Sequence, residues 1–140
     1  MKAILDTDIL SEVLKSKDVN VTTKASAYYA EQGRYTFSTI TVMEIVKGLS
    51  RKRREDAIER FLTLVDKSDL LTLDKVSAEL AGRIYSDLEM VGRPIGVADV
   101  LIGALAIHHN LPLVTGNTSD YQRIQAAGYP LALENWRTPE

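Results

Sequence analysis

The stretch that most constrains the fold is Arg93–Thr118, an apolar segment with a single acid near its start. Residues 95–106 are small or apolar apart from Asp99, so they predict a buried helix with that acid in its first turn. The apolar run Leu111–Val114 then predicts a strand that ends at Thr115 and further polar residues. A buried helix followed by such a strand is typical of an α/β sheet with a site at its carboxyl edge.

Short apolar runs alternate with amphipathic patterns along the whole chain. Strands are predicted at Lys2–Leu5, Tyr35–Ser38, Leu70–Leu73, Pro112–Thr115 and, at a sheet edge, Leu131–Leu133. Further helices are predicted after Asp6 (with Thr7 or Asp8 as N-cap) and over Asn20–Gln32, Thr41–Leu49, Ala57–Val65 and Tyr121–Ala127. Gly33 is the expected C-cap of the second of these, and Asp74 the expected N-cap of another helix that runs to about Val91. This order predicts one α/β domain over residues 1–140, with a mostly parallel sheet.

Composition excludes several classes of site. The chain has no cysteine, so it has no disulfide or thiolate metal site, and we expect a reducing, cytoplasmic location. We expect neither a signal peptide nor a membrane helix, since no apolar run approaches the roughly 20 residues that a span requires. The net charge of −2 means that any contact with nucleic acid must come from a local basic patch.

Three acids stand where a parallel sheet would bring distant segments together: Asp6 after the first strand, Glu44 one turn inside a helix, and Asp99. Each has a structural explanation when taken singly. Asp6 can cap a helix, as can Asp8; Glu44 can lie at the solvent border, and Asp99 can complement a helix dipole. Together, however, the three would repel one another unless a cation compensated. A hard divalent ion such as Mg²⁺ accepts carboxylates and phosphate oxygens and can activate water, so we predict a cation site.

The two histidines, His108 and His109, lie at the other end of the same predicted helix from Asp99. Zinc is therefore a poor candidate for the acidic site. We interpret the histidines as complements to the dipole at the helix C-terminus.

Four blocks carry a resemblance to a known family. They are LDTDILS at 5–11, FSTITVMEIVKG at 37–48, IGVADVLIGALA at 95–106 and LVTGNTSDY at 113–121. In order and spacing they resemble the PIN domain and, within it, the VapC-type ribonuclease toxins of type II (VapBC) toxin–antitoxin systems. The resemblance implies a three-layer α/β/α sandwich and Mg²⁺- or Mn²⁺-dependent endonuclease activity on RNA, with tRNA or another structured RNA as substrate and translation as the process inhibited. It also implies a homodimer and inhibition by a cognate VapB-type antitoxin.

The resemblance also implies roles for single residues. It assigns catalytic positions to Asp6, Glu44, Asp99 and Asn117, and metal ligation to Asp6, Glu44, Asp99 and Asp120. It assigns supporting roles to Thr7, Asp8, Ser11 and Thr115. The chain departs from the family pattern at the fourth acidic position, where Asn117 brings no charge and Asp120 is the alternative. Asp8 also stands where many relatives have asparagine.

The densest basic run comprises Lys47, Arg51, Lys52, Arg53 and Arg54. Such a run is commonly a solvated helix junction. It is equally compatible with a surface that follows RNA phosphates or receives an acidic segment of an antitoxin.

Other functions share parts of this pattern. A response-regulator receiver domain would need a phosphoacceptor aspartate after its third strand and a lysine after its fifth, and Thr115-Gly116-Asn117 offers no such lysine. A metal-dependent phosphohydrolase would share the carboxylates but act on a small phosphorylated substrate. Asn117 leaves open a third alternative, a catalytically weak PIN-like module that binds RNA or protein.

Overall fold

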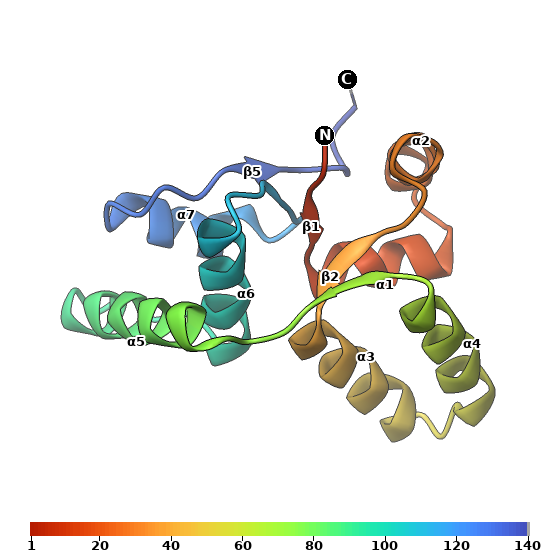
Figure 1. The fold of residues 1–140 in the computed structure, drawn as a ribbon, viewed down its shortest axis with the longest axis horizontal. Coiled ribbons are helices and arrows are strands. Elements are labelled where there is room, and N and C mark those ends of the chain that lie inside the picture. Colours follow the sequence, from red (N-terminus) through yellow and green to blue (C-terminus); the bar gives the residue numbers. More distant parts are fainter. Residues whose placement is uncertain (140) are drawn as a thin grey trace.

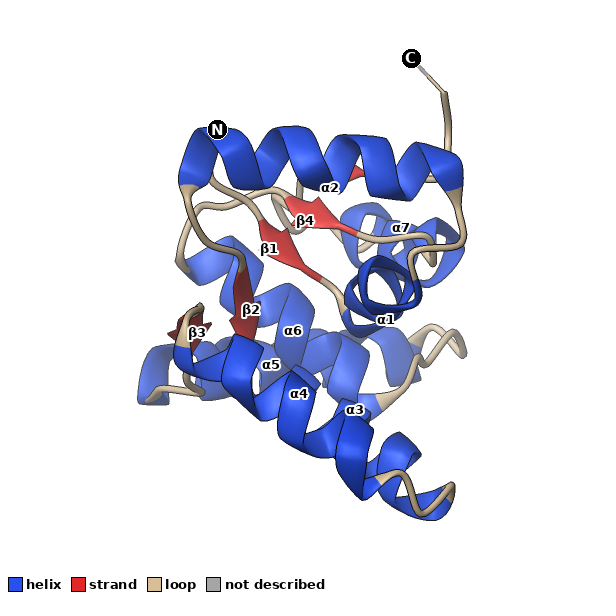
Figure 2. Cartoon of the chain, turned by 90° about the vertical axis from the view of Figure 1, so that its right-hand side faces the viewer, coloured by secondary structure: helices blue, strands red, loops and turns tan. Residues whose placement is uncertain are grey.

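Short parallel strands run through the middle of the computed structural model, which describes residues 1–139 (Figure 1). They are β1 (Ile4–Leu5), β2 (Thr36–Ser38), β3 (Asp69–Leu71), β4 (Leu113–Val114) and β5 (Leu133–Glu134). β4 pairs with both β1 and β5, β2 pairs with β3, and every pairing is parallel. The β2–β3 pair lies beside β1 (Figure 2), so the segments that follow β1, β2 and β4 come close in space.

Helices cover the strands on two sides. They are α1 (Thr7–Lys15), α2 (Val19–Gln32), α3 (Thr39–Arg51), α4 (Glu55–Asp66), α5 (Lys75–Met90), α6 (Val97–His108) and α7 (Thr118–Ala126). Figure 1 shows α5, α6 and α7 on one side of β1 and α1 to α4 on the other. Within residues 1–139, no helix has both the length and the apolar character needed to span a bilayer.

Alternate residues of the central strands feed two separate cores. Ile4 and Leu113 pack in the cluster formed with α5, α6 and α7, whereas Leu5 and Val114 pack in the cluster formed with α1 to α4. This division follows from strand geometry, because successive side chains point to opposite faces of a sheet. The predicted α/β/α sandwich with a parallel sheet is therefore confirmed.

Most predicted elements are present, but several boundaries and one cap differ from the prediction; β3, for example, is Asp69–Leu71 instead of Leu70–Leu73. The first strand is shorter than Lys2–Leu5, since its register with β4 covers Ile4 and Leu5 alone. The last is Leu133–Glu134 instead of Leu131–Leu133. The prediction of Thr7 or Asp8 as the N-cap of α1 is wrong: extended Asp6 is the cap, and its side chain accepts from the Thr7 backbone N–H.

Contact between α6 and α7 depends on a glycine. A Cβ built on Gly103 of α6 would lie 2.9 Å from Cδ1 of Ile124 and 3.7 Å from the Tyr121 ring. Both neighbours on α7 are fully buried, so neither can move into solvent. Gly103 thus allows α7 to lie against the helix that carries Asp99.

We predict that Gly103→Ala destabilises the protein by about 1–3 kcal/mol, because the added methyl overpacks this contact. The matched control is Gly82→Ala in α5, where the new Cβ meets nothing within 4 Å. That variant should gain up to about 1 kcal/mol from helix propensity. Urea unfolding of both variants measures whether the free energy of unfolding falls in Gly103→Ala and rises in Gly82→Ala. Equal stabilisation by the two substitutions would contradict the packing argument.

Candidate active site

Asp6 lies at the centre of a hydrogen-bonded cluster directly after β1, and it is only 3% exposed. Its Oδ1 accepts from the backbone N–H of Thr7 at 2.8 Å and from the Tyr121 hydroxyl at 3.2 Å. Its Oδ2 accepts from the Thr115 hydroxyl at 2.8 Å. Thr115 follows β4, so the parallel pairing of β1 with β4 is what brings these two residues together.

Thr7 connects Asp6 to Glu44. The Thr7 hydroxyl donates to Oε1 of Glu44 at 2.6 Å and lies 3.0 Å from Oγ1 of Thr41. Helix α3 starts directly after β2, where Ser38 caps it by accepting from the Thr41 N–H. The first turns of α3 therefore reach the same edge of the sheet as Asp6.

Asp99 joins the cluster through Tyr121, whose hydroxyl lies 3.3 Å from Oδ1 of Asp99 as well as 3.2 Å from Asp6. Tyr121 is fully buried, and burial together with the two carboxyl groups raises its pKa well above the usual value. A neutral phenol has one proton to donate. It can donate to one of the two carboxylates at a time, so the other does not receive the phenol proton.

Asn117 and Asp120 complete the edge beyond β4. The backbone N–H of Asn117 donates to the Thr115 hydroxyl at 2.9 Å, and its side-chain amide donates to Oδ2 of Asp120 at 3.1 Å. Thr115 also lies 3.5 Å from Oδ1 of Asp8. Because Asn117 uses its amide donor on Asp120, the geometry favours Asp120 as the charged member of this pair and Asn117 as the residue that positions it.

Burial, together with the neighbouring negative charges, raises the pKa values of two acids at this edge. Burial, followed by the charge of Asp8, raises the pKa of Asp6 from 3.8 to about 8. The pKa of Asp99 is also raised, first by burial and then by the charges of Glu44, Asp120 and Asp8. Both shifts mean that the ionised carboxylates lack sufficient compensating charge.

This donor set fits a hard divalent cation. The side chains at the edge offer carboxylate oxygens, and no cysteine or histidine takes part in the hydrogen bonds described above. In the described chain, no three of these carboxylates bring ligand oxygens within 4.8 Å of one another. Hydroxyls of Thr7 and Tyr121 lie between them. Such spacing suits an ion that retains several waters, as Mg²⁺ does.

Sequence reasoning missed two members of this site. Tyr121 closes the last of the four blocks, and its position one turn after Asn117 was the available signal. Arg137 had none: it comes from the C-terminal segment, and its Nη1 lies 3.4 Å from Oδ2 of Asp8. A Cβ on Gly116 would lie 2.1 Å from that Nη1, so Gly116 leaves room for the guanidinium.

Ser11 takes no part in these contacts. It lies on α1, one turn beyond Thr7, and is partly buried. The supporting role predicted for Thr7 and Thr115 has a structural counterpart in their hydrogen bonds, whereas that predicted for Ser11 has none among residues 1–139.

The basic run lies at the corner between α3 and α4. Lys47 and Arg51 follow Glu44 by three and seven residues, so they share its face of α3. Among residues 1–139, Lys47, Arg51, Lys52 and Arg53 form no ion pair. Arg54 differs, since its Nε lies 3.1 Å from Oδ1 of Asp56.

Comparisons with known proteins agree with this architecture. The sequence profile of the PIN domain matches residues 3–126. A tRNA(fMet)-specific endonuclease VapC from Shigella flexneri is 30% identical, with 97% of this chain and 98% of the relative aligned. Ribonuclease VapC2 from Haemophilus influenzae has the same identity and coverage. The toxin-like fold also matches a chain in the crystal structure of VapBC2 from Rickettsia felis bound to a promoter DNA fragment, with a TM-score of 0.80 at 26% identity over 97% of this chain and 99% of that one. A chain in the crystal structure of DNA-bound VapBC from Salmonella typhimurium matches with a TM-score of 0.82 at 25% identity, over 97% of this chain and 98% of that one.

We predict that Asp6→Asn removes a pH dependence from the stability of the metal-free protein. A carboxyl group with a pKa of 3.8 when unfolded and about 8 when folded stabilises the fold fully below the lower value. That contribution is lost as the pH rises through the higher one. Between about pH 5 and about pH 8, the free energy of unfolding of the wild type should fall by on the order of a few kcal/mol relative to that of the variant.

Urea unfolding in EDTA across this range measures the difference. Asp66→Asn, at the exposed end of α4, serves as the control and should follow the wild type. A constant difference between wild type and Asp6→Asn at every pH would show that Asp6 titrates normally.

Proposed function

This chain belongs to the PIN domain family, and we propose that it is a VapC-type endoribonuclease toxin held inactive by a cognate VapB-type antitoxin. The observation that carries the proposal is the convergence of Asp6, Glu44 and Asp99 through the hydroxyls of Thr7 and Tyr121. The aligned relatives named as VapC ribonucleases are covered over almost their whole length. We accordingly treat residues 1–140 as one functional domain.

We infer that Asp6, Glu44, Asp99 and Asp120 hold one Mg²⁺ or Mn²⁺. When bound, the cation supplies positive charge to the scissile phosphate and makes a water molecule more acidic. Asp6 gives up its proton on ligation, because carboxylates bind metals in the ionised form. Thr115 orients Oδ2 of Asp6, and Thr7 fixes Glu44. The Tyr121 hydroxyl lies within hydrogen-bonding distance of both Asp6 and Asp99 and orients one of them at a time.

The proposed substrate is a structured RNA such as tRNA, whose cleavage would block translation. The relative from Shigella flexneri is named as specific for tRNA(fMet). In this chain, Lys47 and Arg51 continue the face of α3 that carries Glu44. They can contact phosphates next to the scissile bond, since an α-helix rises about 1.5 Å per residue and seven residues span about 10 Å.

The proposed assembly is a toxin homodimer in a hetero-oligomer with the antitoxin. Both solved relatives described above are VapBC assemblies bound to DNA. A cytoplasmic location belongs to the same proposal.

We predict that the wild type cleaves RNA with Mg²⁺ or Mn²⁺ and that EDTA abolishes cleavage. Asp6→Asn and Asp99→Asn should each lower the rate more than about 100-fold, beyond the usual cost of losing an outer-shell partner of a metal site. Both substitutions preserve side-chain size, so circular dichroism should be unchanged. Asp66→Asn should retain full activity. Wild-type rates in either site variant would refute the catalytic assignment.

The basic face gives a separate prediction. Lys47→Gln and Arg51→Gln should weaken RNA binding, and each should lower the slope of log K against log salt by about 0.7, the value expected for one phosphate contact to a single strand. Arg54→Gln is the matched control: its guanidinium is engaged by Asp56, so binding should change little. Filter binding at several salt concentrations provides the measurement. A larger effect for Arg54 than for Arg51 would place the RNA elsewhere.

A further inference from the structure

A second group of ligand atoms lies at the far end of α6, away from the acids. His108 is the last residue of α6 and His109 is its C-cap, whereas Asp99 stands in the first turn. The third member, Asp74, is the N-cap of α5. The sequence interpretation, in which the histidines only complement the helix dipole, did not include this acid.

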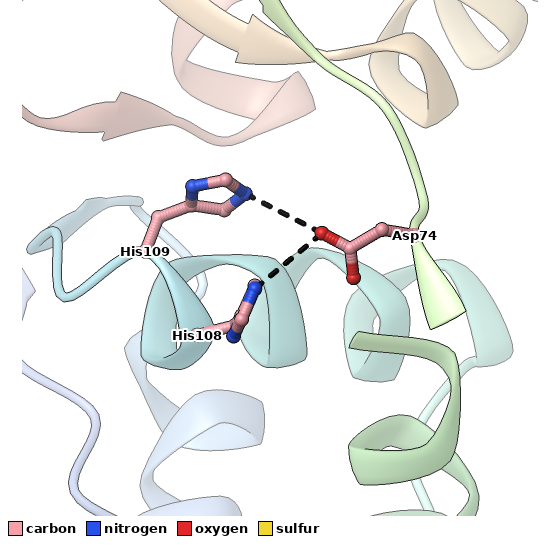
Figure 3. A group of neighbouring side chains, drawn as sticks. All are labelled: Asp74, His108 and His109. Atoms are coloured by element: carbon pink, nitrogen blue, oxygen red, sulfur yellow. Dashed lines mark ion pairs between the residues drawn. The ribbon is translucent and has the colours of Figure 1, made fainter. Parts of the chain in front are cut away.

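Both imidazole rings face the same carboxylate oxygen (Figure 3). Oδ2 of Asp74 lies 3.5 Å from Nε2 of His108 and 4.0 Å from Nε2 of His109. The other oxygen, Oδ1, is occupied, since it accepts from the Ser77 backbone N–H at 2.7 Å. The helix cap thus fixes the carboxylate and leaves Oδ2 directed at the two rings.

These distances suit a shared ion better than direct hydrogen bonds. A separation of 3.5 or 4.0 Å exceeds the 2.7–3.2 Å of a good N–H···O bond. Metal–ligand bonds of about 2.0–2.2 Å place neighbouring ligands of a tetrahedral ion about 3.3–3.6 Å apart. The three ligand atoms lie within 4.8 Å of one another. Small side-chain rotations would therefore bring them to ligand spacing.

The site is also accessible and selective in its chemistry. The side chains of His108, His109 and Asp74 are 34%, 33% and 40% exposed, so an ion can enter and water can complete its coordination. A neutral imidazole protonated at Nδ1 presents a lone pair at Nε2. Two imidazoles and one carboxylate favour zinc and its neighbours over Mg²⁺, which prefers oxygen ligands.

We propose that Asp74, His108 and His109 bind one divalent transition-metal ion of the zinc class, separate from the catalytic cation. The ion links the start of α5 to the end of α6, two helices that pack against each other. Because it binds the folded arrangement, it stabilises that helix pair by mass action. This site does not depend on the ribonuclease assignment.

Histidine NMR tests the site directly. The chain contains two histidines, both in the proposed site, so their ring signals report on it alone. The full chain, with any affinity tag removed, is stripped of metal and titrated with Zn²⁺ above the ordinary imidazole pKa of about 6.5. We expect both ring signals to shift together, to saturate at one ion per chain and to return with EDTA. Mg²⁺ should leave them unchanged.

Variants test the third ligand and the independence from the acidic site. Asp74→Asn keeps a good N-cap but loses the charge, so it should need at least about ten times more Zn²⁺ for the same shift. Asp18→Asn is the matched control, because the Asp18 carboxylate caps α2 by accepting from the Val21 backbone N–H, and Asp18 belongs to neither α5 nor α6. It should respond like the wild type, as should Asp6→Asn.

Three results would overturn the proposal. They are unchanged histidine signals, a shift of one ring alone, or a wild-type response in Asp74→Asn. Loss of the response in Asp6→Asn would instead assign the ion to the acidic edge, and would equally refute a separate site.

Discussion

A buried carboxyl group, Asp6, and a half-buried one, Asp99, face one phenolic hydroxyl, and the rest of this structure depends on that contact. Asp6 and Asp99 are separated by more than ninety residues of sequence, yet both lie within 3.3 Å of the Tyr121 oxygen. Isolated buried carboxylates are costly, and burial together with neighbouring acids raises both pKa values. A protein keeps such an arrangement where the acids perform a task that a neutral core would not.

The fold partly offsets this cost. Helices α1, α6 and α7 all begin at the edge where the acids gather, and helix N-termini favour negative charge. Arg137 approaches from the C-terminal segment and pairs with Asp8 and Glu12. The pKa of Asp6 is still raised to about 8, so these contacts leave room for a cation to bind in exchange for a proton. The metal-free site therefore lowers the stability of the fold, because its acids are placed to bind a cation.

The sequence predicts well those features that depend on residues close together in the chain, such as strands and helix caps. Short apolar or aromatic runs located β1, β2 and β4, and the position of Asp6 after an apolar run pointed to the edge of a parallel sheet. Gly33 and Asp74 took the predicted capping roles because their backbone and side-chain chemistry acts within a few residues. The sequence also indicated that Asp6, Glu44 and Asp99 gather at one edge, but it missed other contacts between distant residues. The approach of Tyr121 to Asp6, of Arg137 to Asp8 and of Asp74 to His108 results from tertiary packing, and no local pattern encodes it.

The central claim is that the acids at positions 6 and 99 hold one cation. Diffraction from crystals of the wild-type chain soaked in Mn²⁺, recorded at the manganese absorption edge, tests it most directly. The account predicts an anomalous peak at ligand distance from the carboxylates of Asp6 and Asp99, and its loss in Asp6→Asn crystals. A protein that cleaves RNA with Mn²⁺ but shows no peak between these two residues would contradict it.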